Sequence, residues 1–111
     1  MIYLGKRTED GCRVYKIHED MSIKELTPDK SLEVVNHSPT GFEWGYGESG
    51  PSQLALALLL DTIGSENTAL LHYHNFKHDV ISMLPDSCWA LHATYDIRKW
   101  YEQRTDVGLP F

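Results

Sequence analysis

Three glycines within residues 45–50 have the spacing G-x-G-x-x-G, the spacing of the phosphate-binding turn in dinucleotide-binding proteins. That function requires a buried strand before the turn, a second strand after the following helix, and an acidic residue about 20 positions on that holds the ribose. Here residues 41–44 are short and begin with glycine, and the residues after Gly64 have a helical pattern. Glu66 stands at the start of that helix. We therefore expect no nicotinamide or flavin site, and no other cofactor is indicated.

The same glycines have two other interpretations. In the first, they permit a sharp turn and close backbone contacts, while Trp44 and Tyr46 anchor the turn in the core. In the second, free N–H groups at the start of the next helix bind a phosphate or a carboxylate. Glu43 and Glu48 place negative charge beside the turn, where they would either repel an anion or themselves serve as the negative cap of the helix. The residues that would contact a ligand in the second interpretation are Tyr46, Gly47, Ser49, Gly50, Ser52 and Gln53.

Two of the six histidines, His74 and His78, stand four positions apart in a predicted helix. That spacing places both imidazoles on one helix face, as a zinc-binding pair requires. A third ligand would have to come from another segment, with Asp61, Cys88 and His92 as candidates. A solvated histidine face beside an apolar stripe explains the same spacing, and we expect no metal site.

No serine or cysteine has the local context of a catalytic nucleophile. The serines lack the G-x-S-x-G turn that exposes a nucleophile in many hydrolases. Cys12 and Cys88 carry no signature of a catalytic or metal-binding thiol, and we expect both to be reduced and partly buried. The sequence therefore predicts no catalytic residues, and it favours a protein that is not an enzyme.

Composition and charge limit the partners. The chain has 111 residues, enough for one domain over residues 1–111, and its 41% hydrophobic residues support a core. Sixteen acidic and ten basic residues give a net charge of −6, which argues against direct nucleic-acid binding. The longest apolar run, residues 54–60, cannot cross a bilayer, and no signal pattern is present. We expect a cytoplasmic protein without membrane contact, located in the host cytoplasm if the chain is viral.

Residues before position 42 predict strands. Residues 2–7 and 12–17 are rich in β-branched and aromatic side chains, and the Asp-Gly pair between them favours a β-hairpin. Residues 22–26 are either a short strand or a loop, and residues 31–36 are predicted to be a third strand. Residues 37–41 have the composition of a loop.

Residues after position 50 predict helices. An apolar run follows Pro51 and ends at Gly64, which indicates a helix surrounded by protein on all sides. Residues 66–84 predict an amphipathic helix, residues 88–93 a strand, and residues 95–103 a short helix. The last residues, 105–111, are expected to be loosely held.

Strands that come first and helices that come later predict an α+β fold rather than alternating βαβ units. The N-terminal antiparallel hairpin or small sheet should pack on the buried central helix and on the second, amphipathic helix. A short C-terminal helix should complete the domain.

The central segment resembles a small family of uncharacterised prokaryotic and viral proteins. Their signature is approximately S-P-x-G-F-x-W-G-Y-G-G-S-G-P-x-Q-L-A-L-A, and residues 38–57 match it except at Glu48, where a third glycine is more usual. The segment from Phe76 to Pro85 resembles the helix that follows in the family. The resemblance implies a domain of unknown function that is common on phages and mobile elements. It marks these positions as fold-defining or site-forming: Trp44, Gly45, Tyr46, Gly47, Ser49, Gly50, Pro51, Gln53 and Leu54.

Two functions stay open at this point. The first is a non-enzymatic interaction domain, encoded by a phage or mobile element, that inhibits a host protein such as part of a defence system in the manner of an anti-CRISPR protein. The second is a small enzyme or a protein that binds or sequesters a phosphate-like or nucleotide-like ligand at the glycine-rich turn. The expected partner in the first case is a protein, and a homodimer is an open alternative.

Overall fold

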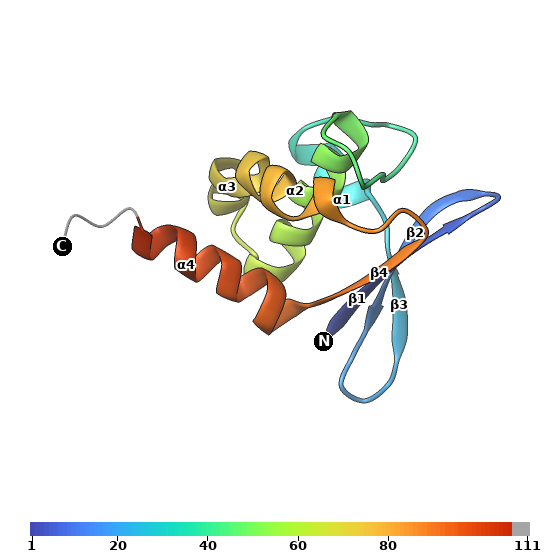
Figure 1. Cartoon of the computed structure of the whole chain (residues 1–111), viewed down its shortest axis with the longest axis horizontal. Helices are drawn as coiled ribbons and strands as arrows, with labels where there is room; N and C mark the ends of the chain where they lie inside the picture. The colour runs from blue at the N-terminus through green and yellow to red at the C-terminus, as the bar shows by residue number, and fades with distance from the viewer. Residues whose placement is uncertain (108–111) are drawn as a thin grey trace.

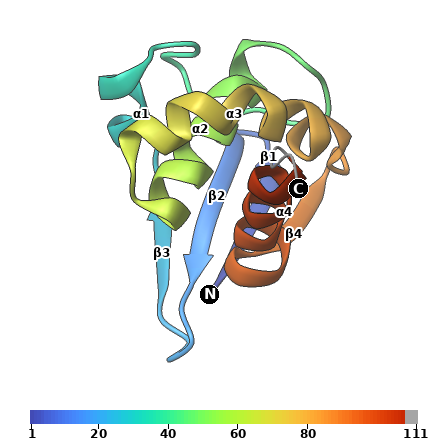
Figure 2. The same cartoon turned by 90° about the vertical axis from the view of Figure 1, so that its left-hand side faces the viewer.

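The structure, a computed structural model, describes residues 1–107, with side chains through Arg104. Strands β1 (Ile2–Thr8), β2 (Gly11–Ile17), β3 (Ile23–Leu26) and β4 (Cys88–His92) form one sheet in the order β3-β2-β1-β4. Every neighbouring pair is antiparallel. Helices α1 (Asp29–Val34), α2 (Ser49–Ile63), α3 (Glu66–Asp79) and α4 (Lys99–Val107) lie on one side of this sheet (Figures 1 and 2). The α+β prediction is confirmed.

The predicted hairpin is confirmed. Gly11 has a positive φ of 114°, which glycine adopts without steric cost, and the Thr8 hydroxyl donates to the Gly11 carbonyl at 2.9 Å. The register pairs Ile2 with Ile17 and Gly5 with Val14. The undecided segment 22–26 forms β3, which pairs with β2 along Ile23–Leu26.

The central helix α2 is buried, as the apolar run predicted. Its side chains from Leu54 to Leu58 are almost completely inaccessible. The Gly64 φ of 81° ends the helix, and the Gly64 N–H donates to the Leu60 carbonyl at 2.9 Å. The helix begins at Ser49, so Pro51 lies in its first turn.

The predicted third strand, residues 31–36, is wrong, because Asp29–Val34 forms helix α1. Pro28 supplies a φ of −75° before the first turn, and Asp29 places a carboxylate where a helix N-terminus favours one. Ser31 is buried while Val34 and Val35 contact the core, a spacing of three and four residues that fits a helix facing α2. An alternation of only six residues could not distinguish the two structures.

Helix α3 ends at Asp79, five residues before the predicted end at Leu84. A short 3₁₀ helix, η1 (Ile81–Met83), follows, and its Ile81 carbonyl accepts the Gly45 N–H at 3.1 Å. Leu84 is extended, with a φ of −69° and a ψ of 146°, as expected for a residue that precedes proline. The contact with the glycine-rich turn and the following Pro85 therefore shorten this helix.

The C-terminal elements follow the prediction closely. β4 buries Trp89 and Leu91 on one side, as expected. A π-helical segment, η2 (Ala93–Arg98), leads into α4, so the helix predicted for residues 95–103 is longer at both ends. Part of the tail expected to be loose, residues 105–107, is helical, and residues 108–111 lie outside the described residues. None of the described helices is long and apolar enough to cross a membrane.

Candidate interaction surface

The glycine-rich turn owes its shape to two of its three glycines. Gly45 has a positive φ of 83°, and a side chain at Gly50 would place its Cβ 2.5 Å from the Glu43 Cβ. Gly47 has neither a positive φ nor a close neighbour within 4 Å. Trp44 is fully buried, whereas Tyr46 is 44% exposed, so the prediction that both aromatic residues anchor the turn is wrong for Tyr46. Its neighbours at positions 45, 47, 48 and 49 are also exposed, which leaves the Tyr46 ring at the surface.

Two of the predicted ligand-binding side chains are used inside the protein. The Ser52 hydroxyl donates to the Glu48 carbonyl at 3.1 Å. Gln53 is fully buried, and its Oε1 accepts the N–H groups of His37 at 2.7 Å and Ser38 at 3.1 Å. Its Nε2 donates to the Ser31 hydroxyl at 2.7 Å and to the Val35 carbonyl at 3.1 Å. All four hydrogen-bonding positions of the Gln53 amide are therefore occupied.

The histidine pair does not form part of a cluster of metal ligands. His74 packs against the rings of Tyr73 and His37, with ring centroids 4.1 and 6.2 Å apart. The His37 Nε2 lies 2.7 Å from the Tyr73 hydroxyl. Among the side chains that the structure describes, those of residues 1–104, no three of His, Cys, Asp or Glu lie close enough together to hold a metal ion.

Cys12 is unsuited to nucleophilic chemistry. Burial and the neighbouring Glu43 carboxylate raise the pKa of the Cys12 thiol to about 11. The thiol therefore stays protonated near neutral pH, and a thiol is a far weaker nucleophile than a thiolate. Glu43 itself is held by the Arg7 guanidinium at 2.9 Å.

A polar cluster joins the sheet to α2. The Tyr3 hydroxyl donates to Asp61 Oδ2 at 2.6 Å and lies 2.9 Å from the Thr62 hydroxyl. Lys16 Nζ contacts Asp61 Oδ1 at 2.9 Å, and both charged side chains are at most 21% exposed. Burial, followed by the hydrogen bond to Asp61, raises the pKa of Tyr3 far above its ordinary value, so the phenol stays neutral. The cluster is a structural link, since each group is engaged by another.

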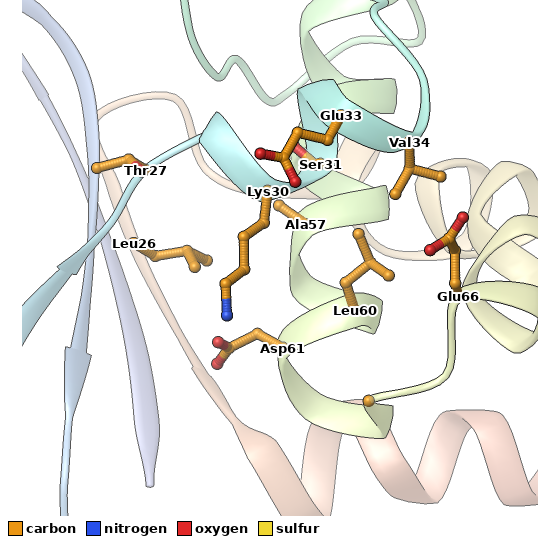
Figure 3. Close-up of a pocket in the computed structure, with 11 residues that line it drawn as sticks. Leu26, Thr27, Lys30, Ser31, Glu33, Val34, Ala57, Leu60, Asp61 and Glu66 are labelled. Atoms are coloured by element: carbon orange, nitrogen blue, oxygen red, sulfur yellow. The ribbon is translucent and has the colours of Figure 1, made fainter.

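A cavity of about 410 Å³ lies beside this cluster, between β3, α1 and α2. Leu26, Val34 and Leu60 supply apolar wall, and charged side chains stand at its rim. Figure 3 shows the Lys30 ammonium group pointing toward the Asp61 carboxylate. The Ser31 hydroxyl on the wall donates to the Pro28 carbonyl at 2.8 Å and accepts from Gln53, so it is engaged within the fold. The cavity is large enough to hold a small molecule.

One side of the sheet faces away from the helices, and it is here called the open sheet face. Figure 2 shows the helices in front of the sheet, on the side where Tyr3, Val14 and Trp89 are buried. Alternate residues point to the opposite side. The register places them in three rows across the strands. The first row is Ile23, Ile17, Ile2 and His92; the second is Glu25, Tyr15, Leu4 and Ala90; the third is Arg13, Lys6 and Cys88.

The apolar residues of the first two rows form a patch that reaches water, with His92 and Glu25 at its margins. Ile23 is 66% exposed and Ile2 is 38% exposed, while Leu4, Tyr15 and Ile17 are half-buried by their neighbours on the same face. Side chains of this kind on a face that no described element covers are typical of a protein-binding surface.

Charges mark the two ends of the open sheet face. Lys6 and Arg13 occupy the third row, and Arg13 Nη1 contacts Glu25 Oε2 at 3.1 Å. At the other end, beyond the first row, the β2–β3 turn carries Glu19 and Asp20, both exposed. Beyond the third row, the β1–β2 turn carries Glu9 and Asp10, which are also exposed. The face therefore has an apolar centre and one basic row, with an acidic turn at each end.

The motifs of the sequence do not reveal this surface, because they mark residues that could do chemistry. The signal was present in the hairpin, where both sets of alternating residues, Tyr3 with Gly5 and Ile2 with Leu4, contain apolar side chains. A strand that is apolar on both sides is expected to be covered on both sides. Only the tertiary structure shows that the described helices all cover the same side.

The comparisons with known proteins place the chain in a family. The model of a family described as being of unknown function (DUF6166) matches residues 3–103. The chain belongs to this family, and the resemblance to a small uncharacterised family is confirmed. No curated protein and no solved structure matches the chain.

Proposed function

We propose that this member of a family of unknown function is a non-enzymatic interaction domain that docks a partner protein onto its open sheet face. The observation that carries the proposal is the apolar patch of the first two rows, which lies away from the helices. Apolar side chains at the centre of a surface and charges at its margins are the usual anatomy of a protein interface.

The charges on this face define the chemistry of the partner. An apolar, nearly flat centre should oppose the first two rows. Carboxylates should oppose Lys6 and Arg13 in the third row, and basic groups should oppose the acidic β2–β3 turn with Glu19 and Asp20. Complementary charges at the rim of an interface increase the association rate and disfavour wrong partners.

Inhibition of a host protein, the role expected from the family resemblance, is part of this proposal. A host protein, for instance a component of a defence system, would be recognised if it presented a surface with that chemistry. Binding by an apolar patch needs no catalytic group. Binding of this kind is therefore compatible with Ser52 and Gln53 making their hydrogen bonds inside the fold, and with a Cys12 thiol that stays protonated.

The ligand-binding alternative has less support from the geometry. Ser52 and Gln53, two of its six residues, make hydrogen bonds within the protein, and Glu48 stands at the start of α2. The remaining polar side chains, Tyr46 and Ser49, lie exposed on the turn.

The test compares an open-face variant with a matched helix-face variant. Ile17→Lys places a charge in the first row, and Leu71→Lys makes the same kind of change on α3, where Leu71 is 75% exposed. Each immobilised protein captures partners from host cells, and a captured protein is purified and its Kd measured by calorimetry. We expect Leu71→Lys to bind as the unmodified chain does and Ile17→Lys to bind at least about tenfold more weakly, a change of about 1.4 kcal/mol.

Circular dichroism establishes that both variants are folded. The proposal is wrong if folded Ile17→Lys keeps every association of the unmodified chain, whether with a host protein or with itself.

A further inference from the structure

We infer that the free edge of β4 binds an extended segment of another protein, which adds one more strand to the sheet. This inference goes beyond the proposed function, because it names the edge of the sheet as a second surface beside the open sheet face. β4 is the last strand at one margin of the sheet, and the helices lie in front of the sheet rather than beyond that margin (Figure 2). The outer side of such a strand presents unpaired N–H and C=O groups, which can bond to another extended chain.

The hydrogen bonds between β1 and β4 show which residues face outward. In an antiparallel pair, residues that bond to the neighbouring strand alternate with residues whose N–H and C=O point away from it. The Arg7 N–H donates to the Ser87 carbonyl at 2.9 Å, directly before β4 begins. The bonds from β4 to β1 therefore come from Trp89 and Leu91, which follow Ser87 at alternate positions.

Cys88 and Ala90 carry the free backbone groups. Their N–H and C=O point away from β1, and no hydrogen bond engages those groups within the part of the chain that the structure describes. The free edge ends at His92, whose N–H donates to Asp96 Oδ2 at 2.6 Å. An added strand can therefore pair with β4 at Cys88 and Ala90.

The opposite margin of the sheet, at β3, is less suited to pairing. β3 is short and contains Lys24 and Glu25, and the Glu25 carboxylate contacts the Arg13 guanidinium at 3.1 Å. Charged side chains on an edge strand disfavour pairing with another strand. β4, with the sequence CWALH, contains no lysine, arginine, aspartate or glutamate. The free edge of β4 is therefore the better template.

The register sets what the added segment must supply. The residue opposite Ala90 exchanges both of its backbone hydrogen bonds with Ala90, and the residue two positions away does the same with Cys88. Neither can be proline, because proline has no N–H. Ala90 is small and exposed on the open sheet face, so a large apolar side chain opposite it can reach across it toward the half-buried Leu4. The segment is therefore extended, free of proline and apolar at the residue that faces Ala90.

Net charge does not select the partner at this edge. Lys6 lies opposite Cys88 on β1, whereas Asp86 precedes β4 and Asp96 follows it. Because charges of both signs flank the edge, recognition depends on the backbone and on the apolar side chain. The ladder is short, and we expect dissociation in the micromolar range.

A second copy of β4 fits this edge poorly. A symmetric antiparallel pair centred on Ala90 would place Cys88 of one copy opposite His92 of the other. Asp96 already holds the His92 N–H, so its carboxylate takes the place at which the Cys88 carbonyl would have to accept a bond. Only the Ala90 pair would then form. The edge is therefore assigned to a segment of a different protein.

Peptides selected on the full chain test the edge. Short linear peptides displayed on phage are selected against the immobilised protein, and the Kd of each synthesised binder is measured by calorimetry. We expect Ala90→Pro, which removes the outward N–H and keeps the bonds to β1, to weaken binding of an edge peptide at least about tenfold. Ile23→Pro is the matched control, because the bond from the His18 N–H to the Ser22 carbonyl places the Ile23 N–H on the outer side of β3. It should leave the Kd unchanged.

Two further measurements do not depend on a proline variant. Amide hydrogen exchange of the unmodified chain, followed by NMR, should slow severalfold at Cys88 and Ala90 when the peptide is bound. Methylation of one peptide backbone nitrogen after another should weaken binding at alternate positions, since only alternate residues of an added strand donate to β4.

Circular dichroism establishes that both proline variants are folded. A library that yields no binder, binders that all survive folded Ala90→Pro, or Cys88 and Ala90 amides that stay unprotected would each overturn the inference. Protection of these amides that rises with protein concentration in the absence of peptide would assign the edge to a second copy and would also overturn it.

The outcomes separate this inference from the proposed function. Loss of a host partner in folded Ile17→Lys, together with a library that yields no edge peptide, would overturn the edge site and leave the open sheet face in place. A peptide that is lost in Ala90→Pro, while Ile17→Lys keeps every association of the unmodified chain, would contradict the proposed function alone.

Discussion

At the scale of single residues, the three glycines of the turn differ in why, or whether, the structure requires glycine at their positions. Gly45 needs a backbone conformation that other residues rarely adopt, Gly50 needs the absence of a side chain beside Glu43, and Gly47 needs neither. The motif therefore has the sequence spacing of a phosphate-binding turn, but two of its glycines are needed for the packing of residues 41–50 against neighbouring segments. A spacing alone could not separate these causes.

Gly50→Ala should reveal this difference. The new methyl group would lie 2.5 Å from the Glu43 Cβ, so backbone or helix must shift, and we expect the free energy of unfolding to fall by about 1–3 kcal/mol. Gly47→Ala is the matched control, with open space at its Cβ and an expected change within about 0.5 kcal/mol. Urea unfolding followed by tryptophan fluorescence measures both. Equal effects of the two substitutions would contradict the steric role of Gly50.

At the scale of elements, α2 was predictable and α1 was not. The apolar run of α2 is long, begins at a proline and ends at a glycine, so local signals agree with its burial. Helix α1 has six residues, and its main polar contact is with Gln53 on α2, more than 20 positions away. Contacts over such a separation are invisible to a local pattern. Gln53 is a polar residue directly before the apolar run of α2, and its partners include the loop backbone.

Gln53→Leu should therefore loosen α1 and the loop together. The substitution leaves the N–H groups of His37 and Ser38 and the Val35 carbonyl without their partner. Because unsatisfied buried polar groups cost about 1–3 kcal/mol each, we expect the free energy of unfolding to fall by about 3 kcal/mol. Denaturant unfolding measures the loss, and hydrogen exchange should show faster opening of α1 and residues 37–38.

The control for this prediction is Gln103→Leu, which makes the same exchange at an exposed position of α4. We expect a change of at most about 0.5 kcal/mol there. A loss for Gln53→Leu that is no larger than the control would show that the amide network does not hold α1 in place.

At the scale of the whole molecule, a two-layer protein must hold its sheet and helices together. Apolar contacts from Tyr3, Val14 and Trp89 do most of this, and the Tyr3–Asp61–Lys16 cluster adds a polar link between the layers. The neutral Tyr3 phenol is favoured in the folded state, since its pKa is raised by burial and by the bond to Asp61. The free energy of unfolding should consequently fall as the pH rises through the alkaline range.

Tyr3→Phe tests that link. At pH 8 we expect the variant to be less stable by about 1–3 kcal/mol through the lost hydrogen bonds. The Tyr3 contribution is complete below the unfolded pKa of about 10 and is lost as the pH rises toward the folded value. The advantage of the unmodified chain should therefore shrink by about 1.4 kcal/mol per pH unit above pH 10. Urea unfolding at several pH values measures it.

An advantage that stays constant to pH 11 would contradict the raised Tyr3 pKa. Tyr95→Phe is the control, because Tyr95 is 71% exposed and its substitution should leave the free energy of unfolding at pH 8 unchanged.

Local signals were enough to predict the hairpin, the buried helix α2 and the strand β4, because an Asp-Gly turn, a capped apolar run and a short alternating segment act over neighbouring residues. The α+β class and the family could also be predicted. Three features became evident only in three dimensions: residues 29–34 form a helix, Gln53 makes its hydrogen bonds inside the fold, and one side of the sheet stays open. These outcomes depend on contacts between segments far apart in the chain, and a local pattern carries no record of which face a distant helix will cover.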